Sequence, residues 1–180
     1  MAMTAQLNVT PDGFCHHADV VVDDAFMEFA VRCLEESDCL LLGRKTYDLF
    51  RDHWPRAAQD AGLPPWETRL ARNIDDIDKM VVSRSMTGSV WQPTSIIVDL
   101  NEDTARSISA TRRTIVLGSP SVIFQLARWG VLDQLMLTVH PVMGREGVRA
   151  FAGPAPATMK FEHDFPTGAS RTYVFVSGRT

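Results

Sequence analysis

Three short segments of glycine and polar residues follow apolar runs in the sequence. They are Gly43-Arg44-Lys45-Thr46, Ser83-Arg84-Ser85 and Gly118-Ser119-Pro120-Ser121. Glycine lets the backbone approach a ligand closely, and the free amides at the start of a helix attract anions. Arg44 and Lys45 add the positive charge that a diphosphate needs, whereas Arg84 between two serines suits a phosphate monoester. The residue types therefore predict phosphate binding.

Each segment also has a plain structural interpretation. Gly43-Arg44 could simply end a strand with a surface arginine, Ser83–Ser85 could be a solvated turn, and Gly118-Ser119 could be a helix cap. The sequence contains neither the GxGxxG dinucleotide fingerprint nor the Walker-A lysine loop. The prediction of a phosphate site therefore depends on all three segments lying at the ends of strands.

Short apolar runs are the elements that would position these segments. Runs of consecutive apolar residues are typical of strands covered on both faces. The sequence has such runs at Leu40–Leu42, Met80–Val82, Ile96–Val98 and Ile115–Leu117, and further strands are expected at Leu7–Thr10, Leu135–Val139, Phe161–Phe165 and Tyr173–Val176. The last two flank a plausible hairpin turn, Pro166–Ser170, so the chain should end with antiparallel strands.

Capping residues and apolar faces mark the helices. Asp24–Glu36 is apolar over most of its circumference, which predicts a largely buried helix. Ser119 can cap a helix with Pro120 at its first position, and Gly130 can stop that helix. Thr46 can cap the helix that follows Gly43.

Two stretches rich in proline and small residues, Pro55–Pro65 and Ala152–Ala157, are expected to be surface loops. Strands that alternate with helical patterns indicate an α/β protein. The sequence thus predicts a single domain over residues 1–180. It would have three layers, α/β/α, with a mixed, mostly parallel central sheet that ends in an antiparallel hairpin.

Composition restricts the classes of function. A length of 180 residues suits one domain, and a net charge of −4 argues against a nucleic-acid-binding protein, which would need clustered positive charge. The three cysteines lack the spacing of a metal or redox site, and Cys15-His16-His17 is interpreted as a polar loop. Neither a signal peptide nor an apolar run of about 20 residues is present. We therefore expect a soluble, cytoplasmic protein without a metal.

Several motifs together resemble the dihydrofolate-reductase-like superfamily. Order and spacing match from about Gln6 to Ser177. The motifs are Thr10-Pro11-Asp12-Gly13-Phe14, Leu41-Leu42-Gly43-Arg44-Lys45-Thr46-Tyr47, Lys79-Met80-Val81-Val82-Ser83-Arg84, Gly118-Ser119, and Gly130-Val131-Leu132-Asp133-Gln134-Leu135. The stretch from His140-Pro141-Val142-Met143-Gly144 through Gly147 to Phe151 is similar to one branch. That branch is the reductase domain of the bifunctional riboflavin-biosynthesis deaminase/reductase and its stand-alone relatives.

The resemblance implies a homodimeric reductase that binds NADPH across the carboxyl ends of the central strands. The residues it implies for the pyrophosphate and adenosine side are Gly43, Arg44, Lys45 and Thr46, and those for the 2′-phosphate are Ser83, Arg84 and Ser85. It implies Gly118, Ser119, Ser121 and Val122 for the pyrophosphate and nicotinamide side, and Thr10 with the Asp12-Gly13 loop near the nicotinamide.

Two carboxylates are candidates for catalysis. By resemblance to dihydrofolate reductase, which uses a carboxylate on the matching helix, the nearest acid is Glu28. Apolar surroundings could raise the pKa of Glu28 into the range of a proton donor. The alternative is a surface ion pair of Glu28 with Arg32, four residues later. Asp12 is either a turn residue or a substrate contact.

Two features of related enzymes are missing from the chain. Phe14–Ala18 lacks the Pro-Trp element of true dihydrofolate reductases, and the zinc signature of the deaminase is absent. The leading hypothesis is therefore an NADPH-dependent reductase of the riboflavin-biosynthesis type, acting on a small heterocyclic or sugar-bearing acceptor. The alternatives are a dihydrofolate or pterin reductase and a non-catalytic NADP-binding module. The stretch Cys15–Asp24 matches no pattern, and we expect it to determine the acceptor.

Overall fold

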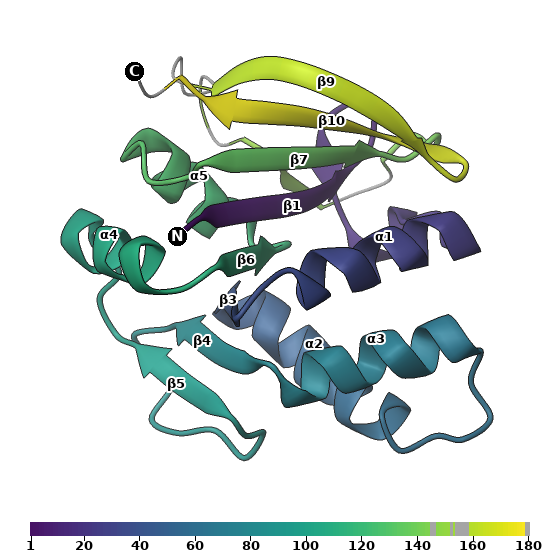
Figure 1. Ribbon diagram of the computed structural model, residues 1–180, viewed down its shortest axis with the longest axis horizontal. Coiled ribbons are helices and arrows are strands. Elements are labelled where there is room, and N and C mark those ends of the chain that lie inside the picture. Colours follow the sequence, from purple (N-terminus) through teal and green to yellow (C-terminus); the bar gives the residue numbers. More distant parts are fainter. Residues whose placement is uncertain (145–146, 152, 154–158, 179–180) are drawn as a thin grey trace.

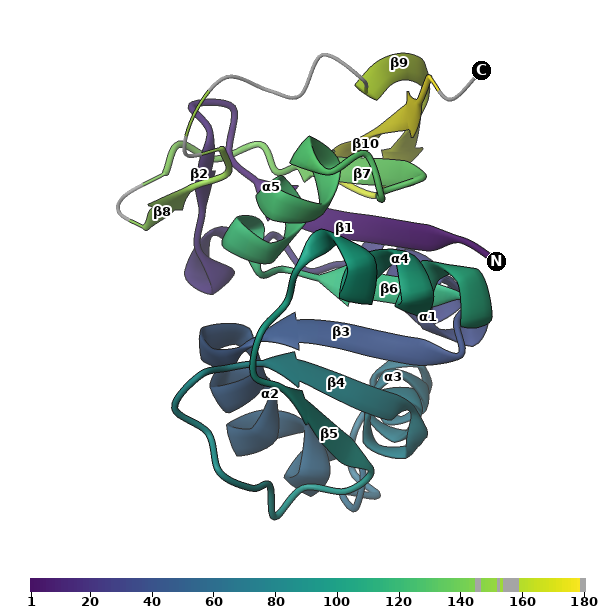
Figure 2. The same cartoon turned by 90° about the vertical axis from the view of Figure 1, so that its left-hand side faces the viewer.

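The computed structural model describes residues 1–144, 147–151, 153 and 159–178, and its central feature is a sheet of eight strands (Figure 1). The strands follow the order β5-β4-β3-β6-β1-β7-β10-β9. Their bounds are Met3–Val9 (β1), Cys39–Gly43 (β3), Asp78–Val82 (β4), Thr94–Ile97 (β5), Thr114–Leu117 (β6), Gln134–Val139 (β7), Met159–Thr167 (β9) and Ser170–Ser177 (β10). A separate pair, β2 (Phe14–Cys15) and β8 (Val148–Arg149), lies beside the main sheet (Figure 2).

The first six strands of that order are parallel, and the last two are antiparallel to their neighbours. The turn of the β9–β10 hairpin contains Gly168, which has a positive φ of 65°. The predicted mixed, mostly parallel sheet with a terminal hairpin is therefore confirmed. Since parallel strands all end at the same edge, the topology gathers the loops that follow them.

Helices cover both faces of the sheet (Figure 1, Figure 2). One face carries α1 (Asp24–Glu35), α2 (Arg44–Ala57) and α3 (Pro65–Asp76), and the other carries α4 (Glu102–Thr111) and α5 (Pro120–Arg128). Alternate residues of each strand supply the two cores: Leu40 and Leu42 belong to the first, whereas Leu41 belongs to the second. This three-layer arrangement is the predicted one.

The structure confirms the predicted buried helix, and one carboxylate fixes its start. Asp23 accepts the backbone N–H of Phe26 at 2.9 Å, and Glu36 forms the carboxyl-terminal cap of α1. Asp23 also accepts the backbone N–H of Ala169 at 2.7 Å, which joins the start of α1 to the β9–β10 hairpin. A Cβ atom on Gly168 would lie 2.0 Å from the Asp23 carboxylate, so this contact requires glycine.

Two predicted side-chain caps are wrong. α2 begins at Arg44 with Gly43 as its cap residue, so Thr46 lies inside the first turn. Ser119 has a left-handed backbone and makes no side-chain cap on α5. Instead, the hydroxyl oxygen of each residue accepts a backbone hydrogen bond from another loop. Pro120 does open α5, and Gly130, with a φ of 62°, follows its end as expected.

The boundaries of several elements also differ from the predictions. β1 spans Met3–Val9 rather than Leu7–Thr10, and both hairpin strands extend beyond their predicted ranges. The expected loop from Pro55 is partly helical, because α2 continues to Ala57 and includes Pro55, which has no N–H to donate and so lacks one helical hydrogen bond. Apart from Gly153, the predicted loop Ala152–Ala157 lies outside the described residues.

Candidate active site

Five loops that follow parallel strands lie along the carboxyl edge of the sheet. In spatial order they are Ser83–Ser85 after β4, Gly43–Thr46 after β3, Gly118–Val122 after β6, Thr10–Gly13 after β1 and His140–Gly144 after β7. All of the segments that the sequence singled out for phosphate binding thus lie on one edge. Figure 2 shows β3, β4 and β5 ending on the same side of the molecule.

Two of these loops are hydrogen-bonded to each other. The Gly43 backbone N–H donates to Ser119 Oγ at 2.8 Å, and the Ser119 backbone N–H donates to Thr46 Oγ1 at 3.2 Å. The loops are packed closely, since a Cβ atom on Gly118 would lie 3.2 Å from Thr46 Cγ2 and one on Gly43 would lie 3.4 Å from Val122 Cγ2. The two segments therefore form one hydrogen-bonded unit, called here the paired loops (residues 43–46 and 118–122).

The polar groups that remain on the paired loops suit an anion. Because Gly43 donates its amide to Ser119, the available amides at the start of α2 are those of Arg44, Lys45 and Thr46. Lys45 and Ser121 are exposed. Arg44 is held by Asp48, with 2.6 Å between Nε and Oδ2, so part of its charge is already neutralised.

In the Ser83–Ser85 segment only two of the three side chains are available to a ligand. Ser83 is buried, and its Oγ accepts the backbone N–H groups of Ser85 at 3.3 Å and Met86 at 3.1 Å, so it shapes the turn. The Arg84 side chain is 87% exposed, and its nearest carboxylate, Asp99, lies 3.9 Å away. Ser85 is exposed. Arg84 and Ser85 are thus the groups of this segment that can bind a phosphate.

The loop after β1 is held by Thr10 and Asp12. Thr10 is buried, and its Oγ1 accepts the backbone N–H of Phe14 at 3.1 Å. Asp12 Oδ1 accepts the backbone N–H of Gly144 at 3.0 Å, which joins the loops after β1 and β7. Hydrogen bonds from the Thr10 side chain and the Gly144 amide lower the pKa of Asp12. Asp12 is therefore ionised at neutral pH and acts as a hydrogen-bond acceptor.

Glu28 lies away from these loops, on the side of α1 that faces α3. Its carboxylate lies 2.9 Å from the guanidinium of Arg69, which also contacts Glu35 at 3.1 Å. The Glu28 side chain is 41% exposed, so the apolar surroundings expected for a proton donor are not found. The alternative of an ion pair is the better description, although the partner is Arg69 of α3 and not Arg32.

Polar residues to which the sequence analysis gave no site role lie on the α1 face of the sheet, beside the same edge. They are Gln6 and Asn8 of β1, Thr138 of β7 and His140 after it, which are linked by hydrogen bonds. Gln6 and Asn8 alternate with the buried Ala5, Leu7 and Val9, so a period of two within β1 was the available signal. That period was missed because the strand was expected to begin only at Leu7.

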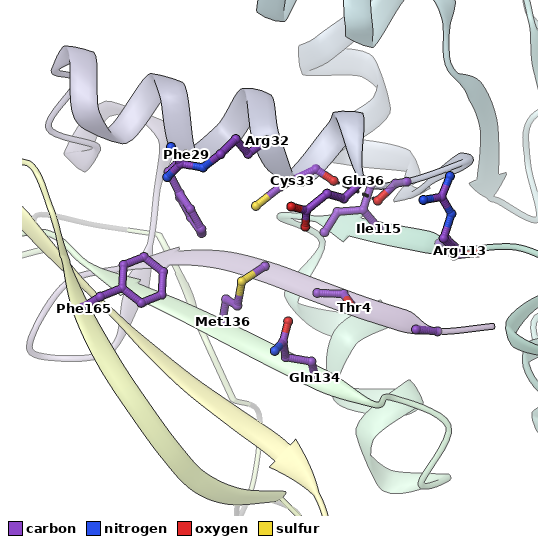
Figure 3. A pocket seen from close by; sticks show the side chains of 13 residues that line it. Thr4, Phe29, Arg32, Cys33, Glu36, Arg113, Ile115, Gln134, Met136 and Phe165 are labelled. Atoms are coloured by element: carbon purple, nitrogen blue, oxygen red, sulfur yellow. Dashed lines mark hydrogen bonds between the residues drawn. The ribbon is translucent and has the colours of Figure 1, made fainter.

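A pocket of about 360 Å³ opens at the opposite, amino edge of the sheet (Figure 3). Its apolar lining includes Phe29 and Cys33 of α1, Met136 and Phe165, with Arg32, Glu36 and Arg113 around them. The Arg113 guanidinium lowers the pKa of Asp38 to about 2 and is bonded to that carboxylate. None of the residues predicted to bind cofactor or to catalyse lines this pocket.

The described residues contain no group of three or more His, Cys, Asp or Glu side chains that could hold a metal ion. Burial raises the pKa of the Cys15 thiol to about 11, so it is protonated at neutral pH. No helix in the described part of the chain is long and apolar enough to cross a membrane.

Comparison with solved structures identifies the fold. A protein of Shewanella sp. PV-4, described as a candidate riboflavin biosynthesis protein, aligns with a TM-score of 0.69 and 18% identity over 99% of this chain and 100% of that one. Dihydrofolate reductase of Enterococcus faecalis, solved with NADP(H), aligns with a TM-score of 0.66 and 14% identity over 99% and 97% of the two chains. The chain thus has the dihydrofolate-reductase-like fold.

RibD of Acinetobacter baumannii aligns with a TM-score of 0.67 and 7% identity over 99% of this chain, which spans 58% of that longer protein. In sequence, the uncharacterized Bacillus subtilis protein YyaP is 28% identical over 149 residues, 81% of this chain and 77% of that protein. No family model matches the chain.

Proposed function

We propose that this protein is an NADPH-dependent reductase of the riboflavin-biosynthesis type, which transfers hydride to a small heterocyclic or sugar-bearing acceptor. The observation that carries the proposal is the pair of hydrogen bonds between Gly43, Ser119 and Thr46, which joins two strand-end loops at the carboxyl edge. In open α/β sheets this edge is where ligands bind. The likeness in fold to a dihydrofolate reductase solved with NADP(H) supports the choice of cofactor.

The donors along this edge fit the anionic parts of NADPH. The amides at the start of α2, with Lys45 and Ser121, would hold the pyrophosphate, and Arg84 with Ser85 would hold the 2′-phosphate. Thr10 and the Asp12-Gly13 loop would lie near the nicotinamide. When bound, NADPH supplies the hydride, and the residues of the chain bind and orient the two reactants.

The two candidate carboxylates are not arranged as proton donors. Asp12 is ionised and already accepts a hydrogen bond from the Gly144 amide. Glu28 is paired with Arg69 on the side of α1 that faces α3. We therefore propose that Asp12 fixes the loops after β1 and β7 around the acceptor, and that water delivers the proton that accompanies hydride transfer.

Cofactor binding is tested by thermal unfolding with NADPH, with NADH and without cofactor. At 100-fold excess over Kd, binding adds about 2.7 kcal/mol to the free energy of unfolding. Loss of a charge-assisted hydrogen bond to phosphate costs about 1.5–3 kcal/mol, so Arg84→Ala should weaken NADPH binding about 10- to 100-fold and leave NADH binding unchanged. Equal responses to the two cofactors would contradict the role of Arg84, and no response would contradict the proposal.

Arg112→Ala is the matched control. Arg112 pairs with Asp78 at 2.7 Å, at the amino end of β4, the strand whose carboxyl end precedes Arg84. Its loss should leave the NADPH response unchanged.

Oxidation of NADPH is then followed with 5-amino-6-(5-phosphoribosylamino)uracil, the acceptor that the riboflavin-type comparison favours, and with dihydrofolate. Turnover of dihydrofolate alone would favour a folate reductase, and NADPH binding without turnover of either would favour a non-catalytic module.

A further inference from the structure

A chain of buried polar side chains crosses the sheet on the face that α1 covers. Gln6 Nε2 donates to Thr138 Oγ1 at 3.1 Å, and the hydroxyls of Thr138 and Thr172 lie 2.9 Å apart. Buried polar groups destabilise a protein unless each has a hydrogen-bond partner. Because hydrogen bonds are directional, a network of this kind also holds its side chains in defined orientations. At the carboxyl edge the network ends at Asn8 and His140, which have no role in the proposed cofactor site.

The hydrogen bonds of His140 fix its tautomer. The ring is 1% exposed, and its Nδ1 accepts the backbone N–H of Val21 at 3.1 Å, with the Ser170 hydroxyl 2.8 Å from the same atom. A backbone N–H can only donate, so Nδ1 carries no proton and the proton of the neutral ring is on Nε2. Burial lowers the pKa of His140, which the Asp23 carboxylate partly opposes, so the ring is neutral at pH 7.

The orientation of the Asn8 side-chain amide follows from this tautomer. His140 Nε2 lies 3.1 Å from Asn8 Oδ1, and Gln6 Nε2 donates to the same oxygen at 2.8 Å. Rotating the amide by 180° would place its NH₂ group against the N–H of His140, so the observed orientation is fixed. Among the residues that the structure describes, Nδ2 has no hydrogen-bond partner, and Asn8 is half-buried. Asn8 therefore presents N–H donors in a defined direction.

These donors lie at a step in the carboxyl edge of the sheet. β6 ends at Leu117, which is opposite Gln6, whereas β1 continues to Val9. The Gly118 backbone N–H donates to Gln6 O at 3.1 Å, and the chain turns away there into the paired loops. Asn8 lies just beyond that turn and two residues before Thr10, between the two segments that the family resemblance implies for the nicotinamide side.

We infer that Asn8 binds the hydride acceptor by donating from Nδ2 to a carbonyl oxygen or an unprotonated ring nitrogen, and that His140 is the positioning residue that fixes the amide. The inference rests on the proposed function, because it adds acceptor recognition to the same site. A pyrimidinone or pterinone ring has acceptor atoms of this kind. A ligand that presents an N–H or NH₂ group at this position would place its donor against the Asn8 Nδ2 donor. With no acceptor between the two groups, such a ligand is rejected.

Asn8→Asp tests the role of the amide nitrogen. The substitution replaces the outward NH₂ group by an oxygen of similar size, while the inner oxygen still accepts from Gln6 and His140. With saturating NADPH, the KM for 5-amino-6-(5-phosphoribosylamino)uracil or dihydrofolate should rise about tenfold or more, and the NADPH-induced shift in Tm should stay as in the wild type. Asn101→Asp makes the same change at the exposed N-cap of α4, where a carboxylate oxygen still accepts the Thr104 N–H, so it should change KM less than about twofold.

A spectroscopic readout makes the test independent of turnover. In ¹⁵N–¹H spectra of labelled protein, the side-chain NH₂ signals that vanish in Asn8→Asp belong to Asn8. They should shift when either probe is added to protein saturated with NADP⁺. Signals that stay in place with both probes, or an unchanged KM in Asn8→Asp, would overturn the inference. A wild-type protein whose Tm does not respond to NADPH would overturn the proposed function instead, so the two failures are distinguishable.

Discussion

Ser119 makes its hydrogen bonds to a loop that is distant in sequence, so its neighbours in the sequence do not indicate its role. Its backbone is left-handed, its Oγ accepts from Gly43, and its N–H donates to Thr46. The preceding Gly118 is also left-handed, with a φ of 56°. Two consecutive left-handed residues turn the chain back toward β3, and only the second of them carries a side chain. This turn places the hydroxyl of Ser119 against the Gly43 amide, and so it determines the spacing of the paired loops.

A side chain at Gly118 would disturb this turn. In Gly118→Ala the new Cβ would lie 3.2 Å from Thr46 Cγ2, in a backbone conformation that costs a non-glycine residue about 1–2 kcal/mol. Thermal unfolding should show a fall in Tm of about 2–8 °C. Because Thr46 must move, the NADPH-induced shift in Tm should also shrink.

Gly130→Ala is the control for Gly118→Ala. Gly130 has a similar φ of 62°, but a Cβ atom there would meet no other heavy atom within 4 Å. Its substitution should cost similar stability and leave the response to NADPH intact. Equal loss of the NADPH response in both variants would show that backbone strain alone, and not the packing of the paired loops, is responsible.

At the scale of elements, His140 joins parts of the chain that are far apart in sequence. It follows β7, contacts Asn8 of β1, lies beside Ser170 of β10, and accepts the amide of Val21 before α1. The ring of Phe26 in α1 packs against it edge-on, with 5.2 Å between ring centroids. The packing of four elements, β1, β7, β10 and α1, therefore depends on contacts with one neutral imidazole.

This dependence predicts a pH effect on stability. Burial lowers the pKa of His140 in the folded state, whereas an unfolded histidine has a pKa of about 6.5. As the pH falls below about 6.5, the unfolded chain binds the proton first, so the free energy of unfolding decreases. Urea unfolding at pH 8, 7, 6 and 5 should show that the stability advantage of the wild type over His140→Gln narrows as the pH falls. The other histidines cancel in this difference, and a constant difference would contradict the prediction.

At the scale of the whole molecule, β5 and β9 are the outermost strands of the sheet in the described part of the chain. Phe161 on β9 is 55% exposed. An edge strand offers unpaired backbone groups to a second chain, and an exposed aromatic side chain favours such contact. We expect a homodimer, as the resemblance to the reductase family implies, with β9 at the interface.

Light scattering after size exclusion tests this expectation. The wild type should have twice the 20.0 kDa mass of one chain. Phe161→Lys should shift the equilibrium toward monomer, whereas Val90→Lys, a change at a side chain that is 94% exposed in a loop, should not. A monomeric wild type would contradict the expectation, and a dimer that is insensitive to Phe161→Lys would place the interface elsewhere.

The strands of the main sheet, helix α1 and the common edge on which the strand ends lie were predictable because their signals are local. Consecutive apolar residues such as Leu40–Leu42 specify strands buried on both faces, and glycine or serine after each run marks the strand end. Parallel strands then place these ends on one edge, which the structure confirms for Gly43, Ser83 and Gly118. The apolar circumference of Asp24–Glu36 was also sufficient to predict α1 almost to the residue.

The long-range partners of polar side chains were decided by the tertiary structure. Ser119 and Thr46 both suit helix caps locally, yet each bonds to a residue more than 70 positions away, because the two loops meet only when β3 and β6 pair. Glu28 pairs with Arg69, 41 positions away, and not with Arg32 on its own helix. A sequence specifies which groups can donate and accept, but long-range packing selects among them. The network that orients Asn8 is therefore visible only in the folded chain.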